Sequence, residues 1–178
     1  MSLIVIDPGH GGKDPGAVAN GLQEKDLNLQ IALELARLLA AKGLAVRLTR
    51  ENDRYPALED RCEIANNLKA GLFLSIHCNA SPDRTAHGLE VFHHPASEPG
   101  KRLAQAIHGE LGKLGRAARG VTPADFYVLK HTAMPACLVE CGFLTNPGEA
   151  EWIKTHVNEI TAALAQGIAN VLVGAKGQ

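Results

Sequence analysis

Short apolar runs alternate with segments of helical periodicity along most of the chain. Apolar or β-branched residues predict strands at 3–6, 44–49, 72–78, 89–93 and 136–140. Apolar residues at three- and four-residue spacing predict helices near 27–38, 58–68, 97–114 and 147–171. Because strand–helix–strand alternation favours parallel pairing, we predict one α/β domain over 1–178, with its core at about 3–172. Its central sheet should be mixed but mostly parallel, with about six strands and helices on both faces.

The composition agrees with a globular domain and argues against several classes of protein. Hydrophobic residues make up 46% of the 178 residues, and no apolar run approaches the roughly 18 residues of a membrane-spanning helix. The formal net charge of -1 argues against a nucleic-acid partner, which would require clustered Lys and Arg. We therefore predict no membrane span and no nucleic-acid binding, and we expect a monomer. No signal-peptide pattern precedes the first predicted strand, as in a trimmed mature domain.

Four polar residues interrupt this pattern at informative places. His10 lies in the stretch "DPGHGG" after the first strand, and Glu24 comes just before the first long helix. His77 ends the apolar run "LFLSIH", and Glu140 ends "ACLVE". In open α/β sheets, ligands bind beyond the carboxyl ends of the strands. The sheet can therefore bring these four residues together.

Each of these residues also has a purely structural explanation. A single strand-end histidine is often only a hydrogen-bonding group, and Glu24 alone would be a first-turn charge favoured by the helix dipole. Glu140 is harder to explain in this way, because burying an unpaired carboxylate is costly. Two imidazoles and one carboxylate form the ligand set of a catalytic zinc site, and a second carboxylate off the metal would be its general base. The motif HExxH is absent, so the ligands must come from separate strands and loops.

Longer motifs make the chain resemble a known family. They are "IVIDPGHGGKDPGA", "EKDLNLQIALELARLL", "VRLTRENDRYPALEDRCEIANNLKAGLFLSIHCNA", "GLEVFHH" and "MPACLVECGFLTNPGEAEWI". In this order, over nearly the whole chain, they resemble the zinc-dependent N-acetylmuramoyl-L-alanine amidases of the Amidase_3 type. That family includes bacterial autolysins and the catalytic domains of phage endolysins.

The resemblance implies a peptidoglycan hydrolase. Its substrate would be the amide between the lactyl group of N-acetylmuramic acid and the L-alanine that begins the stem peptide. His10, Glu24 and His77 would bind Zn²⁺, and Glu140 would be the catalytic acid/base. The implied place of action is the cell wall, in the periplasm or outside the cell, for a phage endolysin or a trimmed mature domain. Many relatives carry a wall-binding module, so the chain would be a catalytic fragment without one.

Three further residues near these motifs have open roles. Asp7 would either hold the loop around His10 or orient a metal ligand from behind. Asn79 would hydrogen-bond the substrate or hold the site, or it would simply end its strand. The role of His131, before the last predicted strand, stays open.

The four cysteines are interpreted as small buried hydrophobes, since no CxxC pair occurs; they are Cys62, Cys78, Cys137 and Cys141. Cys78 follows His77, and Cys141 follows Glu140. Side chains alternate across a strand, so both thiols should point away from the metal. We expect neither to bind zinc, and we expect no disulfide that the fold requires.

Two other functions stay open at this stage. The first is a different zinc peptidase that acts on stem peptides, such as a carboxypeptidase. It would share the metal chemistry and differ in the amide that it cuts. The second is an inactive wall-binding module, which the presence of all four presumed site residues makes a poor explanation.

The interval from His94 to Phe126 bears on regulation. Some relatives carry an extra helix there that blocks the zinc site until a partner removes it. Here one amphipathic helix fills 97–114, and 115–125 has room for a loop and a turn but not for a second helix. We therefore predict a solvent-open zinc without a fourth protein ligand, and an enzyme that is active without an activator.

Overall fold

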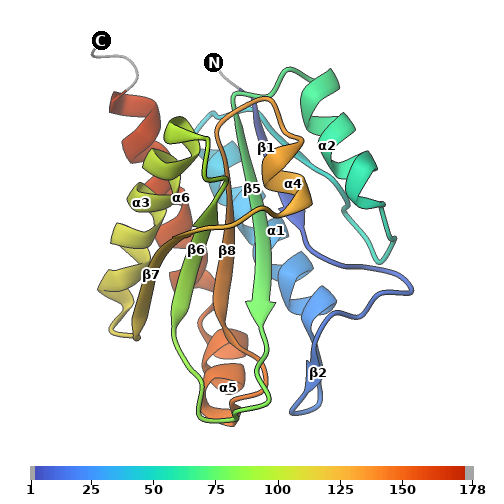
Figure 1. Ribbon diagram of the computed structural model, residues 1–178, viewed down its shortest axis with the longest axis vertical. Coiled ribbons are helices and arrows are strands. Elements are labelled where there is room, and N and C mark those ends of the chain that lie inside the picture. The colour runs from blue at the N-terminus through green and yellow to red at the C-terminus, as the bar shows by residue number, and fades with distance from the viewer. Residues whose placement is uncertain (1–2, 175–178) are drawn as a thin grey trace.

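The computed structural model describes residues 3–174 and contains a six-stranded sheet between two layers of helices (Figure 1). The strands lie in the order β4-β1-β5-β8-β6-β7. Their bounds are β1 Ile4–Pro8, β4 Val46–Leu48, β5 Leu72–Asn79, β6 Leu89–His93, β7 Ala118–Pro123 and β8 Ala136–Phe143. Within this sheet β6 runs antiparallel to β8, and the other neighbouring pairs are parallel. The mixed, mostly parallel sheet that the sequence predicts is therefore confirmed.

Helices cover both faces of the sheet, as predicted (Figure 1). One face packs against α1 (Glu24–Ala41), α3 (Glu98–Leu111) and α6 (Val157–Gly174). The other face carries α2 (Leu58–Asn67) and the short α4 (Tyr127–Lys130). A small hairpin of β2 (Val18–Ala19) and β3 (Leu22–Gln23) precedes α1.

Alternation along β1 explains why its apolar run is unbroken. Ile4 and Ile6 belong to the core under α1, whereas Val5 belongs to the core under α2, and all three are fully buried. A parallel strand covered on both faces has no solvent side, so it needs no polar positions until it ends. The first polar side chain of β1 is Asp7, and the loop that follows carries the site.

Two details differ from the predicted elements. The terminal helix is divided into α5 (Pro147–Thr155) and α6, with a break at His156. The segment expected to be a loop and a turn contains β7, which pairs with β6 at the edge of the sheet. The helix expected over 97–114 is present as α3, which Ser97 caps, followed by a 3-10 turn over Gly112–Leu114. Along the described part of the chain, no helix is both long and apolar enough to span a bilayer.

A buried ion pair lies where β1 ends. Asp7 and Arg61 are both at most 3% exposed at their side chains, and Arg61 Nη1 lies 2.7 Å from Asp7 Oδ1. Asp7 also accepts hydrogen bonds from the hydroxyls of Thr49 and Ser75, at 2.6 and 2.7 Å. These contacts join β1 to β5, to α2 and to the end of β4. Of the two explanations for Asp7, the contacts match a residue that holds the loop.

We expect Arg61→Met to lower the free energy of unfolding by about 3–5 kcal/mol, because it leaves Asp7 as a buried charge without its counter-charge. Urea denaturation measures this loss as a lower transition midpoint. Arg37→Met is the matched control, because Arg37 pairs with Glu34 at the surface of α1. If both variants unfold at the wild-type midpoint, the pair is not essential to the fold.

Candidate metal centre and active site

A glycine in the loop "DPGHGG" does more than allow a turn, because it lets the loop lie directly against His77 on β5. A Cβ atom at Gly9 would lie 2.2 Å from Cε1 of His77, so a side chain there would displace that ring. His10 itself has a φ of 60°, a left-handed conformation that is uncommon for residues other than glycine. The loop therefore sets the positions of both histidines.

Two arginines hold this loop by its carbonyl groups. Arg50 donates to the carbonyls of Pro8 and Gly9, at 3.0 and 2.8 Å, and to that of Lys25 at 2.8 Å. Arg61 donates to the carbonyls of Pro8 and His10, both at 2.8 Å. Both arginines are almost fully buried. Their hydrogen bonds fix the backbone beside His10 and tie it to the first turn of α1.

His10, Glu24 and His77 come together as a candidate metal cluster, with one ligand atom from each residue within 4.8 Å of the others. Oε1 of Glu24 lies 3.1 Å from Nε2 of His10 and 2.9 Å from Nδ1 of His77. Glu24 is the first residue of α1 and is 5% exposed. The fold thus places next to each other the three residues that the sequence predicts as ligands.

The electrostatics of this cluster suit a cation. Burial by itself would raise the pKa of Glu24, but hydrogen bonds and positive charge from His10 and His77 outweigh burial and hold that pKa well below its ordinary value. Burial opposes protonation of His10, whereas the carboxylates of Glu24 and Asp14 favour it, and the net effect raises the pKa of His10. A divalent cation bound here would attract the Glu24 carboxylate in place of the imidazoles of His10 and His77.

Asp14 is a further site residue, which no motif in the sequence marks. Its Oδ2 lies 2.8 Å from Nδ1 of His10, which leaves Nε2 facing Glu24. A carboxylate behind a ligating histidine fixes the ring orientation and the tautomer. The only signal in the sequence is an acidic residue four positions after His10, in "GGKDPGA".

We expect Asp14→Asn to weaken zinc binding roughly 10- to 100-fold, the usual effect of losing a carboxylate behind a ligand. Competition with a chromophoric chelator measures the dissociation constant. Asp53→Asn is the control, because Asp53 contacts Gly12 and Lys25 in the same region but touches none of the three presumed ligands. Equal zinc affinity in wild type and Asp14→Asn would show that Asp14 does not orient His10.

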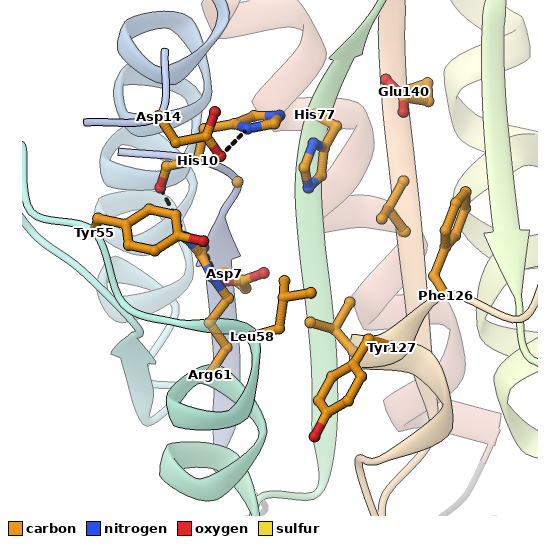
Figure 2. Close-up of a pocket in the computed structure, with 13 residues that line it drawn as sticks. Asp7, His10, Asp14, Tyr55, Leu58, Arg61, His77, Phe126, Tyr127 and Glu140 are labelled. Carbon is orange, nitrogen blue, oxygen red and sulfur yellow. Dashed lines mark hydrogen bonds and ion pairs between the residues drawn. The ribbon is translucent and has the colours of Figure 1, made fainter. Parts of the chain in front are cut away.

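Glu140 lies beside the cluster but outside it. It pairs in register with His77 across β5 and β8, and Figure 2 shows both side chains at the same cavity. Its Oε2 is buried and has no hydrogen-bond partner among residues 3–174. Burial, and then the negative charges of Glu24 and Glu90, raise the pKa of Glu140 well above its ordinary value. A carboxyl group in this environment readily holds a proton, and a nearby cation would make it readily lose one.

His10, His77 and Glu140 line a cavity of about 370 Å³ on the face that carries α2 and α4 (Figure 2). One flank comes from the β1 loop and from α2 with the loop before it, and includes Asp14, Tyr55 and Leu58. The opposite flank comes from β8 and the segment around α4, and includes Leu138 and Phe126. Tyr55, Leu58 and Phe126 are each at least 40% exposed, so the flanks offer apolar surface to a ligand. Nothing in the sequence marks these flanking residues, because single exposed apolar residues carry no motif.

Other predicted residues lie around this cavity without lining it. Asn79 ends β5, and its Oδ1 accepts a hydrogen bond from the backbone of Ala80 at 2.8 Å. This contact matches a strand-ending residue, and substrate binding by Asn79 stays a prediction. The ring of His131 stacks on Tyr127 with centroids 4.1 Å apart, and its carbonyl accepts from Asn66. These contacts give His131 a structural role beside α4.

All four cysteines are buried and carry free thiols. Cys78 and Cys141 belong to the core under α1, on the opposite face of the sheet from the cavity. Burial raises the pKa of both thiols, which keeps them uncharged. The candidate metal cluster includes neither of them.

The residues present fit a zinc ion. Two imidazole nitrogens and one carboxylate oxygen are typical ligands of catalytic zinc, which keeps a further position open. Ligands about 2.1 Å from a tetrahedral ion lie roughly 3.4 Å apart, close to the separations of 2.9 and 3.1 Å found here. Two histidines and a carboxylate that could hold the ion, with Glu140 adjacent, gather where β1, β5 and β8 approach the start of α1, and this is the organisation of a metal-dependent α/β hydrolase.

Comparison with known proteins agrees with this class. Residues 4–170 match the family model Amidase_3, described as N-acetylmuramoyl-L-alanine amidase. The chain is 43% identical over 176 residues to the sporulation-specific N-acetylmuramoyl-L-alanine amidase of Bacillus subtilis, covering 97% of this chain and 67% of the relative. It is 42% identical over 165 residues to the amidase LytC of the same organism, covering 91% of this chain but only 33% of LytC. The chain belongs to the Amidase_3 family of N-acetylmuramoyl-L-alanine amidases.

A solved structure shows the same fold. The crystal structure of N-acetylmuramoyl-L-alanine amidase from Clostridium difficile superposes with a TM-score of 0.93 at 37% identity. The match covers 96% of both chains. The match thus extends over nearly all of that solved chain, whereas this chain spans only a third of LytC.

Proposed function

We propose that this chain hydrolyses the amide between the lactyl group of N-acetylmuramic acid and the L-alanine of the peptidoglycan stem peptide. The observation that carries the proposal is the buried, unpartnered Oε2 of Glu140 in the cavity that His10 and His77 line. Such a group suits proton transfer next to a metal. Family membership supports the choice of amide, and it supports the cell wall as the place of action.

In this proposal His10, Glu24 and His77 hold a zinc ion. When bound, zinc supplies Lewis acidity, which makes water a better nucleophile and polarises the carbonyl group. Asp14 orients His10, and Arg50 and Arg61 keep the loop in place. The chain thus arranges its ligands before the substrate binds, so little reorganisation is needed during the reaction.

Glu140 moves the proton. Its carboxylate accepts a proton as the water oxygen forms a bond to the lactyl carbonyl carbon. The same group then donates that proton to the alanine nitrogen as the carbon–nitrogen bond breaks. The products are the lactyl carboxylic acid and a stem peptide with a free amino terminus.

Digestion of purified peptidoglycan, followed by mass spectrometry, tests the proposal. We expect intact stem peptides that begin with L-alanine, released only by protein loaded with zinc. Release of single carboxyl-terminal amino acids would instead identify a carboxypeptidase. Binding to the wall without any product would identify an inactive module. Protein treated with a chelator and then reloaded with zinc is the control for the metal requirement.

The same assay tests regulation. The segment from Glu98 to Asp125 forms α3, a 3-10 turn and β7, and it contributes no residue to the candidate metal cluster of the described chain. We propose that the purified chain is active without an added protein. Activity that appears only after a second protein is added would contradict this.

A further inference from the structure

Glu140 lies at one flank of the cavity, and the presumed metal ligands lie nearer the other flank. This asymmetry determines which end of the substrate lies at which flank. The strand order puts β1 on one side of β5 and β8 on the other. His10 and Asp14 follow β1, His77 lies on β5, and Glu140 lies on β8. Figure 2 shows the same sequence across the cavity, with Asp14 and Tyr55 at one side and Glu140 and Phe126 at the other. The presumed metal ligands thus lie nearer one flank, and the proton donor lies at the opposite one.

The amide that is hydrolysed has an acyl side and a nitrogen side. The reaction requires a different protein group next to each of them. The carbonyl oxygen must face the ligand cluster, where positive charge stabilises it. The nitrogen must come within hydrogen-bond reach of Glu140, which protonates it. The substituent on nitrogen therefore extends towards the β8 side, and the acyl substituent on the trigonal carbon lies nearer the β1 side than that substituent does.

The side chains on the two flanks agree with this direction. Beyond Glu140 the wall is apolar: Leu138 lies two positions before Glu140 on the same strand face, and Phe126 lines the cavity beside it. Phe126 packs edge-to-face on Phe92, with centroids 5.2 Å apart, and Phe92 pairs with Leu138 across β6 and β8. An apolar wall of this kind suits the methyl group of alanine.

The flank on the β1 side combines an aromatic ring with charged groups. Tyr55 packs against Gly12, and its ring lies 5.2 Å from the ammonium group of Lys13. The carboxylate of Asp14 lines the same side. An aromatic ring face among hydrogen-bonding groups suits a sugar ring, which has C–H groups on its faces and hydroxyl groups around its rim.

We propose that Phe126 contacts the L-alanine of the stem peptide and that Tyr55 contacts the N-acetylmuramoyl group. This assignment rests on the proposed function and deepens it. Phe126 then acts as a specificity-determining residue for the first amino acid of the peptide, and Tyr55 acts as one for the sugar. The two residues form a matched pair, because each is aromatic and 40% exposed.

The decisive experiment crosses two variants with two substrates. The substrates are N-acetylmuramoyl-L-alanyl and N-acetylmuramoyl-glycyl dipeptides, which differ by one methyl group. We expect wild-type enzyme to favour alanine at least about tenfold in kcat/KM, the usual effect of one methyl group in an apolar pocket. Phe126→Ala should lose most of that preference, and Tyr55→Ala should keep it. Zinc content and thermal unfolding verify that both variants stay folded and loaded.

Binding of the two products gives a second measurement that does not depend on turnover. In NMR titrations of zinc-loaded protein, Phe126→Ala should weaken binding of the L-alanyl dipeptide, and Tyr55→Ala should weaken binding of N-acetylmuramic acid.

The outcomes separate the assignment from the function on which it rests. A wild-type enzyme that cleaves neither substrate would overturn the proposed function and this assignment with it. Cleavage without an alanine preference, or a preference that Tyr55→Ala abolishes and Phe126→Ala retains, would overturn the assignment alone. The assignment would also be overturned if Phe126→Ala weakened binding of N-acetylmuramic acid and Tyr55→Ala weakened binding of the L-alanyl dipeptide.

Discussion

Replacing Glu140 with Gln is expected to reduce amide hydrolysis by roughly 10²-fold or more while the protein keeps its full zinc content. Glutamine has nearly the same shape, but its amide can neither accept the proton from water nor pass one to the alanine nitrogen. Glu140 stands outside the ligand cluster, so the metal should stay bound. Initial rates on a soluble muramoyl peptide, together with metal analysis of the same samples, measure both effects.

Glu90→Gln is the matched control for this variant. Glu90 pairs in register with Glu140 on the next strand, so the same chemical change is made one strand away. Its carboxylate accepts from Thr122 at 3.0 Å and pairs with Arg119, and it does not line the cavity. We expect a rate change of less than about tenfold there, because only the charge near Glu140 changes. A Glu140→Gln enzyme that is fully loaded with zinc and works near the wild-type rate would exclude Glu140 as the acid/base.

Strong periodicity made most of the fold predictable. The buried parallel strands are continuous apolar runs, because both of their faces are covered, and they were recognised for that reason. The sequence does not predict β7, because an edge strand has little to bury: of its residues "ARGVTP", only Val121 packs against the core under α1. The sequence does not predict the break at His156, because Ile153, Val157 and Ile160 keep helical spacing across it.

The site was predictable to the extent that motifs carry chemistry. His10, His77 and Glu140 were noticed because each is polar where a buried strand ends or its loop begins. The residues that hold them carry no such signal, since Arg50 is an ordinary charge after a strand and Arg61 an ordinary charge within a helix until their carbonyl partners are known. The orientation of the substrate in the cavity is equally impossible to predict from the sequence. It depends on the strand order, which puts β5 between the β1 loop and Glu140.

His77→Ala is expected to lose most of the zinc, and with it nearly all activity. Two protein ligands remain after this change, and a catalytic zinc site needs three. The loss can be measured without turnover, because a metal that binds only the folded state raises its stability. At a free zinc concentration about 100 times the dissociation constant, the wild-type protein should gain about 2.7 kcal/mol. The variant should show no such gain in thermal unfolding experiments with and without zinc.

His93→Ala is the control that distinguishes a ligand from an ordinary strand-end histidine. His93 ends β6 as His77 nearly ends β5, and its Nδ1 makes a hydrogen bond with the carbonyl of His94 at 2.9 Å. It is 6% exposed, so its removal should destabilise the fold, but the stability gained from zinc should stay at the wild-type value. A zinc-dependent gain that persists in His77→Ala would exclude His77 as a ligand. A gain that disappears equally in both variants would mean that the assay reports damage to the sheet rather than loss of the metal.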